Sequence, residues 1–245
     1  MSIIEYGIMD FQTDIFGNLP PSALVRLAIE SSTREAKLEG ISFERLKEEF
    51  DATWMAARIR LETERPVCGG NILTAEVTPS AVKRGCFYRQ ITFFCGDERV
   101  GRCVTACMPV VIGERRILRP ETLYDGYSVS GPAPDIPEMH RLRSRERGDH
   151  ICDITVRGWD CDFNGHMTAA RYADFACEAA GYWTGMPKLM RSMQIDYCAE
   201  CYAGEVLSMS GKQTESGLLV TGVHFNGRTA FSAMCDMCNL NLDKN

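Results

Sequence analysis

Four polar side chains lie within one short segment, DCDFNGHM, that passes directly into an alanine-rich helical pattern. They are Asp160, Asp162, Asn164 and His166. A carboxylate, an amide and an imidazole at this spacing can orient a water molecule and transfer a proton near neutral pH. The start of a helix also offers free backbone N–H groups, and Gly165 lets the backbone approach a substrate closely. The segment is therefore a candidate catalytic centre, with an ordinary helix cap as the alternative.

A second candidate pair, Glu200 and Cys201, lies in the later segment IDYCAECYAGE. If this segment is a strand, the two side chains point to opposite faces and only one of them faces the turn. Cys201 could be a nucleophile, with His166 as its base and Asn164 as the group that orients the base. Glu200 could instead be a general base that activates water, which we favour because the route avoids a second hydrolysis step. The backbone N–H groups of Gly165 and His166 are the expected oxyanion donors.

The remaining polar residues are expected to support the site, to be structural or to lie outside the site. Asp162 is expected to fix the geometry of the turn in support of the site, and Asp160 to be structural. His140 and His150 fall in a predicted linker, and His224 is expected to be a strand residue near a hairpin, so none of the three is expected to be catalytic.

The composition excludes several classes of protein. The chain has 245 residues, of which 45% are hydrophobic and 24% charged, and its formal net charge is −6. It has no basic field to attract nucleic acid and no apolar run of the roughly 20 residues that cross a bilayer. The N-terminal residues lack the basic region of a signal peptide, so we expect a cytoplasmic protein with reduced thiols.

The chain has 12 cysteines, a number that raises the question of metal binding. Two pairs with zinc-like spacing, Cys198–Cys201 and Cys235–Cys238, could together hold a structural zinc ion. The second pair lies in a predicted strand, where positions three apart point to opposite faces. We therefore expect neither a metal nor a cofactor.

The two halves of the chain have the same predicted order of elements, namely a strand, a turn, a helix and several further strands joined by short turns. A proline-rich segment, 119–150, separates them as a linker between an N-terminal domain at 1–118 and a C-terminal domain at 151–245. We expect an α+β fold of two tandem domains, each a long helix packed on a curved antiparallel sheet.

The duplicated turns differ at the positions where chemistry is possible. Alignment of Gly17 with Gly165 gives an offset of 148 (165 − 17), and alignment of Gly70 with Gly204 gives an offset of 134 (204 − 70). At these aligned positions, only the second half has the amide of Asn164, the imidazole of His166 and the carboxylate of Glu200, so these three residues are not needed merely to form the turn. The aligned pairs are Asp14 with Asp162, Phe16 with Asn164, Asn18 with His166, Pro66 with Glu200 and Val67 with Cys201.

These residues resemble a known family, the acyl-ACP thioesterases of plants and bacteria, whose chains contain two hotdog folds. The motif VRGWDCDFNGHMTAARY is similar to the Asp-x-Asn-x-His block of the family, with Tyr172 at the expected helix position, and IDYCAECYAGE is similar to its EYRREC strand. The resemblance spans nearly the whole chain. It departs from the family pattern after His166, where Met167 is followed by Thr168 and Ala169 instead of two asparagines.

The resemblance implies hydrolysis of a fatty acyl thioester on acyl carrier protein (ACP), which releases free fatty acid in fatty acid biosynthesis. The C-terminal domain would supply the catalytic residues and the N-terminal domain most of the acyl-binding tunnel. The implied partner is acyl-ACP, without nucleic acid or membrane insertion, and the chain is expected to be a monomer or a homodimer. The implied catalytic residues are Asp162, Asn164, His166, Glu200 and Cys201.

Several alternatives share this fold. They are an acyl-CoA thioesterase, a dehydratase of 3-hydroxyacyl thioesters and a non-catalytic acyl sensor, the last of which would need a DNA-binding segment that 1–20 is too short to form. Basic residues in and before the linker are either solvated charges or a docking surface for the acidic carrier. These residues are Arg115, Arg116, Arg119, Arg141, Arg143, Arg145 and Arg147.

Overall fold

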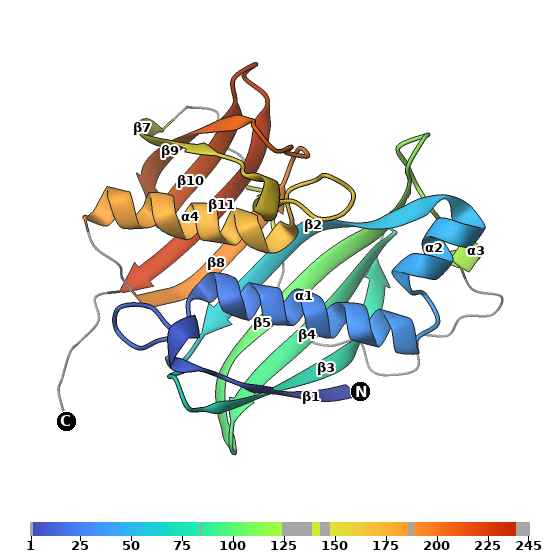
Figure 1. The fold of residues 1–245 in the computed structure, drawn as a ribbon, viewed down its shortest axis with the longest axis horizontal. Coiled ribbons are helices and arrows are strands. Elements are labelled where there is room, and N and C mark those ends of the chain that lie inside the picture. The colour runs from blue at the N-terminus through green and yellow to red at the C-terminus, as the bar shows by residue number, and fades with distance from the viewer. Residues whose placement is uncertain (1, 84, 124–138, 143–147, 186–188, 239–245) are drawn as a thin grey trace.

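The computed structural model describes residues 2–83, 85–123, 139–142, 148–185 and 189–238, in which one antiparallel sheet runs across both halves of the chain (Figure 1). The elements of the first half are β1 Ser2–Gly7, α1 Pro21–Leu38, α2 Phe43–Phe50, β2 Ala52–Thr63, β3 Ile72–Lys83, β4 Cys86–Cys95, β5 Glu98–Val111, β6 Arg116–Ile117 and α3 Pro120–Leu123. Those of the second half are β7 Asp149–Thr155, α4 Ala169–Thr184, β8 Leu189–Tyr197, β9 Val206–Thr214, β10 Gly217–His224 and β11 Thr229–Cys238.

Local sequence accounts for the long helices. Pro20 and Pro21 occupy the N-cap and first turn of α1, where the missing N–H of proline loses no hydrogen bond. At the other end, α4 stops at Gly185, whose φ of 75° lies in the left-handed region that favours glycine. The core-facing side of α4 is rich in alanine, including Ala173 and Ala176, so this helix can lie close against the sheet.

The predicted α+β class and the tandem arrangement are confirmed. The strands follow the order β1-β3-β4-β5-β2-β8-β11-β10-β9-β7, with β6 paired to β5. Both predicted hairpins are present, as β4–β5 and as β10–β11, the latter with a turn at Asn226 and Gly227. The domain boundaries remain predictions, although α3 and the first residues of β7 lie inside the predicted linker. Most of that linker, 124–138 and 143–147, lies outside the described residues.

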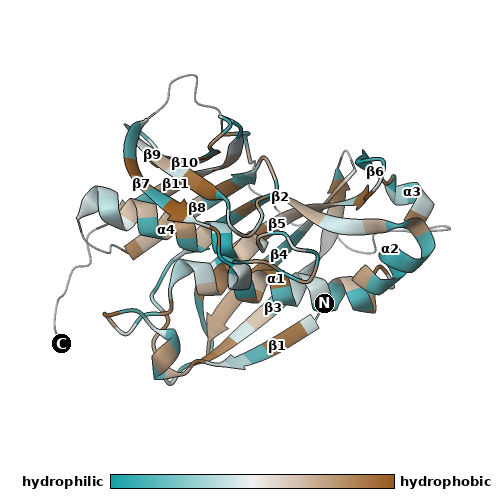
Figure 2. Ribbon diagram, turned by 45° about the horizontal axis from the view of Figure 1, so that its top comes forward, coloured by the Kyte–Doolittle hydropathy of each residue, from teal (hydrophilic) through white to brown (hydrophobic). Residues whose placement is uncertain are grey.

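The two halves meet at the centre of the sheet, a junction that periodicity within each half does not indicate. Strand β2 pairs antiparallel with β8, and Ile59 lies opposite Ile195. Both side chains are buried within one hydrophobic core that includes residues of both halves. Figure 2 shows, by contrast, a largely hydrophilic α2 at the periphery.

The long helices α1 and α4 lie side by side on the same face of the sheet (Figure 1). An ion pair joins them, with Arg26 Nη2 3.7 Å from a carboxylate oxygen of Asp174. Neither of these helices, nor any other helix among the described residues, is long and apolar enough to cross a membrane. The turn that leads into each helix is held by an isolated β-bridge, Asn18 with Cys68 before α1 and His166 with Tyr202 before α4.

Candidate active site

The turn before α4 is a compact hydrogen-bonded loop that begins at Asp162. Its backbone N–H donates to the carbonyl of His166 at 2.9 Å, and the Gly165 N–H donates to the carbonyl of Asp162 at 2.9 Å. One carboxylate oxygen of Asp162 also accepts a hydrogen bond from the backbone N–H of Asn164 at 2.8 Å. Asp162 and Asn164 are exposed and His166 is half-buried, so all three lie at the surface beside the start of the helix.

The twin turn in the first half has the same hydrogen bonds. Asp14 N–H donates to the carbonyl of Asn18 at 2.8 Å, and its carboxylate accepts from the N–H of Phe16 at 2.8 Å. Gly17 and Gly165 even share a φ of 78°, in the left-handed region. Asp162 therefore performs a turn-forming role that the fold repeats at Asp14, as predicted for its geometry.

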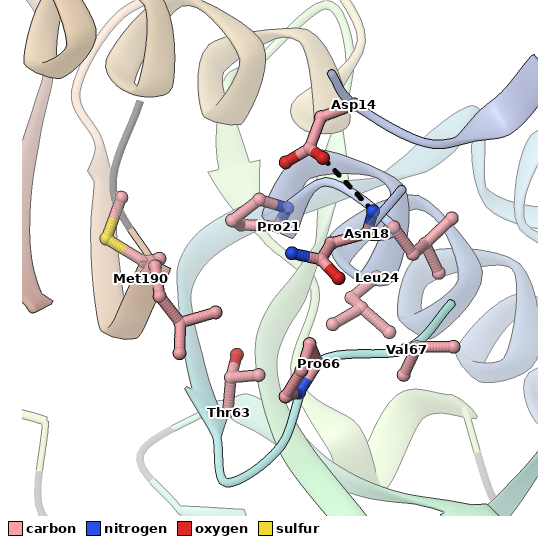
Figure 3. Close-up of a pocket in the computed structure, with 10 residues that line it drawn as sticks. Asp14, Asn18, Pro21, Leu24, Thr63, Pro66, Val67 and Met190 are labelled. Atoms are coloured by element: carbon pink, nitrogen blue, oxygen red, sulfur yellow. Dashed lines mark hydrogen bonds between the residues drawn. The ribbon is translucent and has the colours of Figure 1, made fainter. Parts of the chain in front are cut away.

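The space beside this first turn is small and mainly apolar (Figure 3). It is a cavity of about 30 Å³. Leu24, Pro66 and Val67 line it, together with Met190 from β8. In the first half, the position that corresponds to the candidate active site is thus lined mainly by apolar side chains.

The second half instead gathers polar side chains there. His166 forms an isolated antiparallel bridge with Tyr202, and their rings meet edge to face with centroids 5.0 Å apart. The Tyr202 hydroxyl donates to a carboxylate oxygen of Glu200 at 3.1 Å. The structure therefore brings together the predicted His166 and Glu200 and adds Tyr202 to them, while the side chain of Asn164 is exposed and donates to Asp162 at 3.5 Å.

An arginine from the other half of the chain completes this cluster. Arg115 lies in the turn between β5 and β6, and its guanidinium donates to Glu200 at 2.9 Å. Burial alone raises the pKa of Glu200, but the hydrogen bonds from Tyr202 and Arg115, with the nearby His166, outweigh burial. The pKa of Glu200 consequently lies below its usual value, which keeps the carboxylate ionised at neutral pH.

Cys201 lies on the opposite side of the chain from Glu200. Its side chain has no exposed surface, and its sulfur is 3.7 Å from Nε2 of His224 instead of facing His166. Burial raises the pKa of this thiol to about 11, so the thiolate that a nucleophile requires is disfavoured. This placement supports Glu200 over Cys201 as the reactive group.

The expected oxyanion donors are not equivalent in the structure. The Gly165 N–H already donates within the turn, so its use by a substrate would require that hydrogen bond to be replaced. The helix itself begins only at Ala169, three residues after His166, with Thr168 as its N-cap. The backbone of His166 thus lies just before the helix instead of within its first turn.

Asp160 has a structural environment. Its side chain is 1% exposed and accepts hydrogen bonds from the backbone N–H of Arg157 at 2.7 Å and from Nε of Arg171 at 2.8 Å. These contacts tie the short 3-10 helix Gly158–Asp160 to the first turn of α4.

Two residues of the cluster were missed by the sequence reasoning. Tyr202 is two positions after Glu200, and a period of two along an extended chain would have placed both side chains on one face. Arg115 lies 85 positions before Glu200 and belongs to the other half, so no local pattern could indicate their contact.

The fold and the one-sided site define a tandem hotdog protein with acid–base groups in its second domain. Residues 143–231 match the family model of the acyl-ACP thioesterase C-terminal domain. The resemblance predicted from the sequence is therefore confirmed for the second half of the chain, as a match to this family model.

Solved structures show the same fold over the whole length. An acyl-ACP thioesterase from Bacteroides thetaiotaomicron is 19% identical with a TM-score of 0.80, over 96% of each chain. The 12:0-ACP thioesterase from Umbellularia californica is 16% identical with a TM-score of 0.78, over 97% of this chain and 96% of that one. A putative oleoyl thioesterase from Lactobacillus plantarum is 17% identical with a TM-score of 0.78, over 95% and 94%. No curated protein sequence matches the chain.

Proposed function

We propose that the protein hydrolyses the thioester of a fatty acyl group on ACP and releases free fatty acid and holo-ACP in fatty acid biosynthesis. One observation carries this proposal: the chain forms the same turn twice, and only the second copy has an imidazole, His166, and a nearby carboxylate, Glu200, where the first copy has Asn18 and Pro66. The thioesterase domain of the second half and the names of the similar acyl-ACP enzymes support ACP as the carrier.

In the proposed reaction, Glu200 acts as the general base. Its carboxylate takes a proton from a water molecule while the water oxygen attacks the thioester carbonyl carbon. The negative charge on the carbonyl oxygen is stabilised by the backbone N–H and the ring of His166, and Asn164 orients the water or the thioester. The carbon–sulfur bond then breaks, and the proton on Glu200 passes to the departing sulfur. The products are a carboxylic acid and the carrier thiol.

The two halves have different proposed roles in this reaction. The C-terminal domain, 151–245, supplies the reacting groups, and the N-terminal domain, 1–118, binds the acyl chain. Arg115 is a positioning residue from the first half, because it holds the carboxylate of Glu200 in place and lowers its pKa. This arginine is therefore assigned to the site instead of to a docking surface. Of the other docking candidates, Arg143, Arg145 and Arg147 lie outside the described residues, whereas Arg116, Arg119 and Arg141 lie within them.

The substrate class is tested with purified protein and acyl groups of graded length on ACP and on coenzyme A. Release of free fatty acid with a higher kcat/KM on acyl-ACP is the expected result. A preference for acyl-CoA would replace the proposal by an acyl-CoA thioesterase. Binding without release of acid from either carrier would leave only an acyl-binding protein and overturn the enzymatic proposal.

Arg115→Gln should shift the acid limb of the pH profile of kcat/KM to higher pH. Loss of the guanidinium charge lets the pKa of Glu200 rise. As the pH falls, the Glu200 carboxylate is therefore protonated at a higher pH than in the unchanged protein. The profile is measured on acyl-ACP. Arg116→Gln is the matched control, since the neighbouring Arg116 pairs with Glu114 at 2.7 Å. An unmoved acid limb in Arg115→Gln, or an equal shift in both variants, would argue against Glu200 as the base.

A further inference from the structure

A second cluster of chemically capable side chains lies behind the candidate active site. It consists of Cys201, Glu205 and His224, one donor atom of each lying within 4.8 Å of the other two. The sulfur of Cys201 is 3.7 Å from Nε2 of His224, and a carboxylate oxygen of Glu205 is 3.5 Å from Nδ1. The mechanism proposed above uses none of these three side chains.

The donor set matches the preferences of zinc. Thiolate, imidazole and carboxylate all bind Zn²⁺, with bonds of about 2.3, 2.0 and 2.1 Å, which in a tetrahedron separates the donor atoms by roughly 3.3–3.6 Å. The 3.7 Å between the Cys201 sulfur and Nε2 is close to this spacing, whereas the 3.5 Å contact of Glu205 is with the other ring nitrogen, Nδ1. Because the sulfur and the carboxylate approach different ring nitrogens, a cation at Nε2 requires Glu205 to rotate toward it. The side chain of Glu205 is 40% exposed, which leaves room for that rotation.

The backbone on either side of the three residues fixes where they lie. Gly204, with a φ of 90°, turns the chain between Cys201 and Glu205. His224 ends β10 and is fixed in the hairpin by its N–H bond to the carbonyl of Arg228 at 2.9 Å. Cys201 is fully buried and His224 is 9% exposed, so the partly exposed Glu205 marks the side from which an ion can enter.

We propose that Cys201, Glu205 and His224 bind a divalent transition-metal cation of the zinc type, with a fourth position open to water. Three protein ligands and one open position are a common arrangement for zinc. Rotation of Glu205 toward Nε2 would change the hydrogen bond that its carboxylate accepts from the Tyr202 N–H at 2.8 Å, and the Tyr202 hydroxyl holds Glu200, so the cation would act on the candidate active site through Tyr202. The assignment does not depend on the thioesterase proposal.

This site differs from the one that cysteine spacing suggests. Of the pair Cys198–Cys201, Cys198 is exposed and its sulfur lies 3.6 Å from the carbonyl of Asp196, whereas Cys201 is buried against His224. Cys235 is buried in the hydrophobic core. The proposed ligands therefore include one cysteine from the first pair and neither cysteine of the second.

The test uses the full chain, stripped with a chelator and titrated with Zn²⁺ and with Co²⁺. We expect one equivalent of metal per chain, a thiolate-to-cobalt charge-transfer absorption and a higher melting temperature with zinc. His224→Gln and Cys201→Ser should each weaken zinc affinity by at least about 100-fold, since changes outside the ligand shell already cost 10–100-fold. His224→Gln leaves the buried thiol in place, so it remains informative if Cys201→Ser unfolds.

Two variants serve as matched controls. Cys198→Ser removes an exposed thiol of the same loop, and His150→Gln removes an exposed histidine whose ring lies 3.9 Å from Asp153. Both should bind zinc as the unchanged protein does. The proposal is overturned if the unchanged protein binds no metal at one equivalent per chain, or if His224→Gln keeps the affinity and the cobalt absorption.

Discussion

Replacement of His166 by alanine is expected to lower kcat on acyl-ACP by about 10²–10⁴-fold, the usual contribution of a group that transfers or donates a proton in the transition state. The ring is half-buried beside Tyr202, and the turn is held by backbone hydrogen bonds and by Asp162, so the fold should tolerate the loss. The measurement is single-turnover release of fatty acid, with the melting temperature recorded for each variant.

The duplication offers a control at the same place in the fold. Asn18→Ala changes the residue that occupies the position of His166 in the first half, where it forms the corresponding bridge with Cys68. This variant should keep kcat, because Asn18 has no acid–base group and Pro66 takes the place of Glu200 in the first half. Similar losses of kcat in both variants would mean that His166 acts through the turn and not through its imidazole.

The sequence was most informative where the fold repeats itself. Gly17 and Gly165 align because both turns need a residue with a φ of 78°, and the hydrogen bonds of Asp14 recur at Asp162. Such local requirements leave a pattern in each copy. Asn164 does not belong to that pattern, because Phe16 occupies its position in the first turn. The turn itself therefore does not need Asn164.

Contacts between distant segments could not be predicted in the same way. Arg115 reaches Glu200 because β2 pairs with β8, and that pairing places the two halves in one sheet. The predicted strand ends at Tyr197, so Glu200 and Cys201 lie after it, and their opposite orientations do not follow from strand alternation. The neighbour of Cys201, His224, comes from the far end of β10, and only the pairing of the strands brings it there.

A comparison of Glu200→Gln with Cys201→Ala should separate the two chemical routes. Glutamine keeps the size and the hydrogen-bonding oxygen of Glu200 but cannot take a proton from water, so kcat should fall by about 10²–10⁴-fold. Cys201→Ala should keep turnover close to that of the unchanged protein, because its sulfur is buried and faces His224. Both variants are assayed with a chelator present, so that a cation bound at Cys201 does not enter the comparison.

The stability of Cys201→Ala must be measured beside its activity, since loss of a buried sulfur leaves a small cavity that costs about 1 kcal/mol. A folded Cys201→Ala that turns over acyl-ACP removes any covalent route through this cysteine. An inactive but folded Cys201→Ala, together with an active Glu200→Gln, would contradict the water route. That outcome would also require the loop to rearrange, because a nucleophilic sulfur would have to leave the core to reach the side on which His166 and Tyr202 meet.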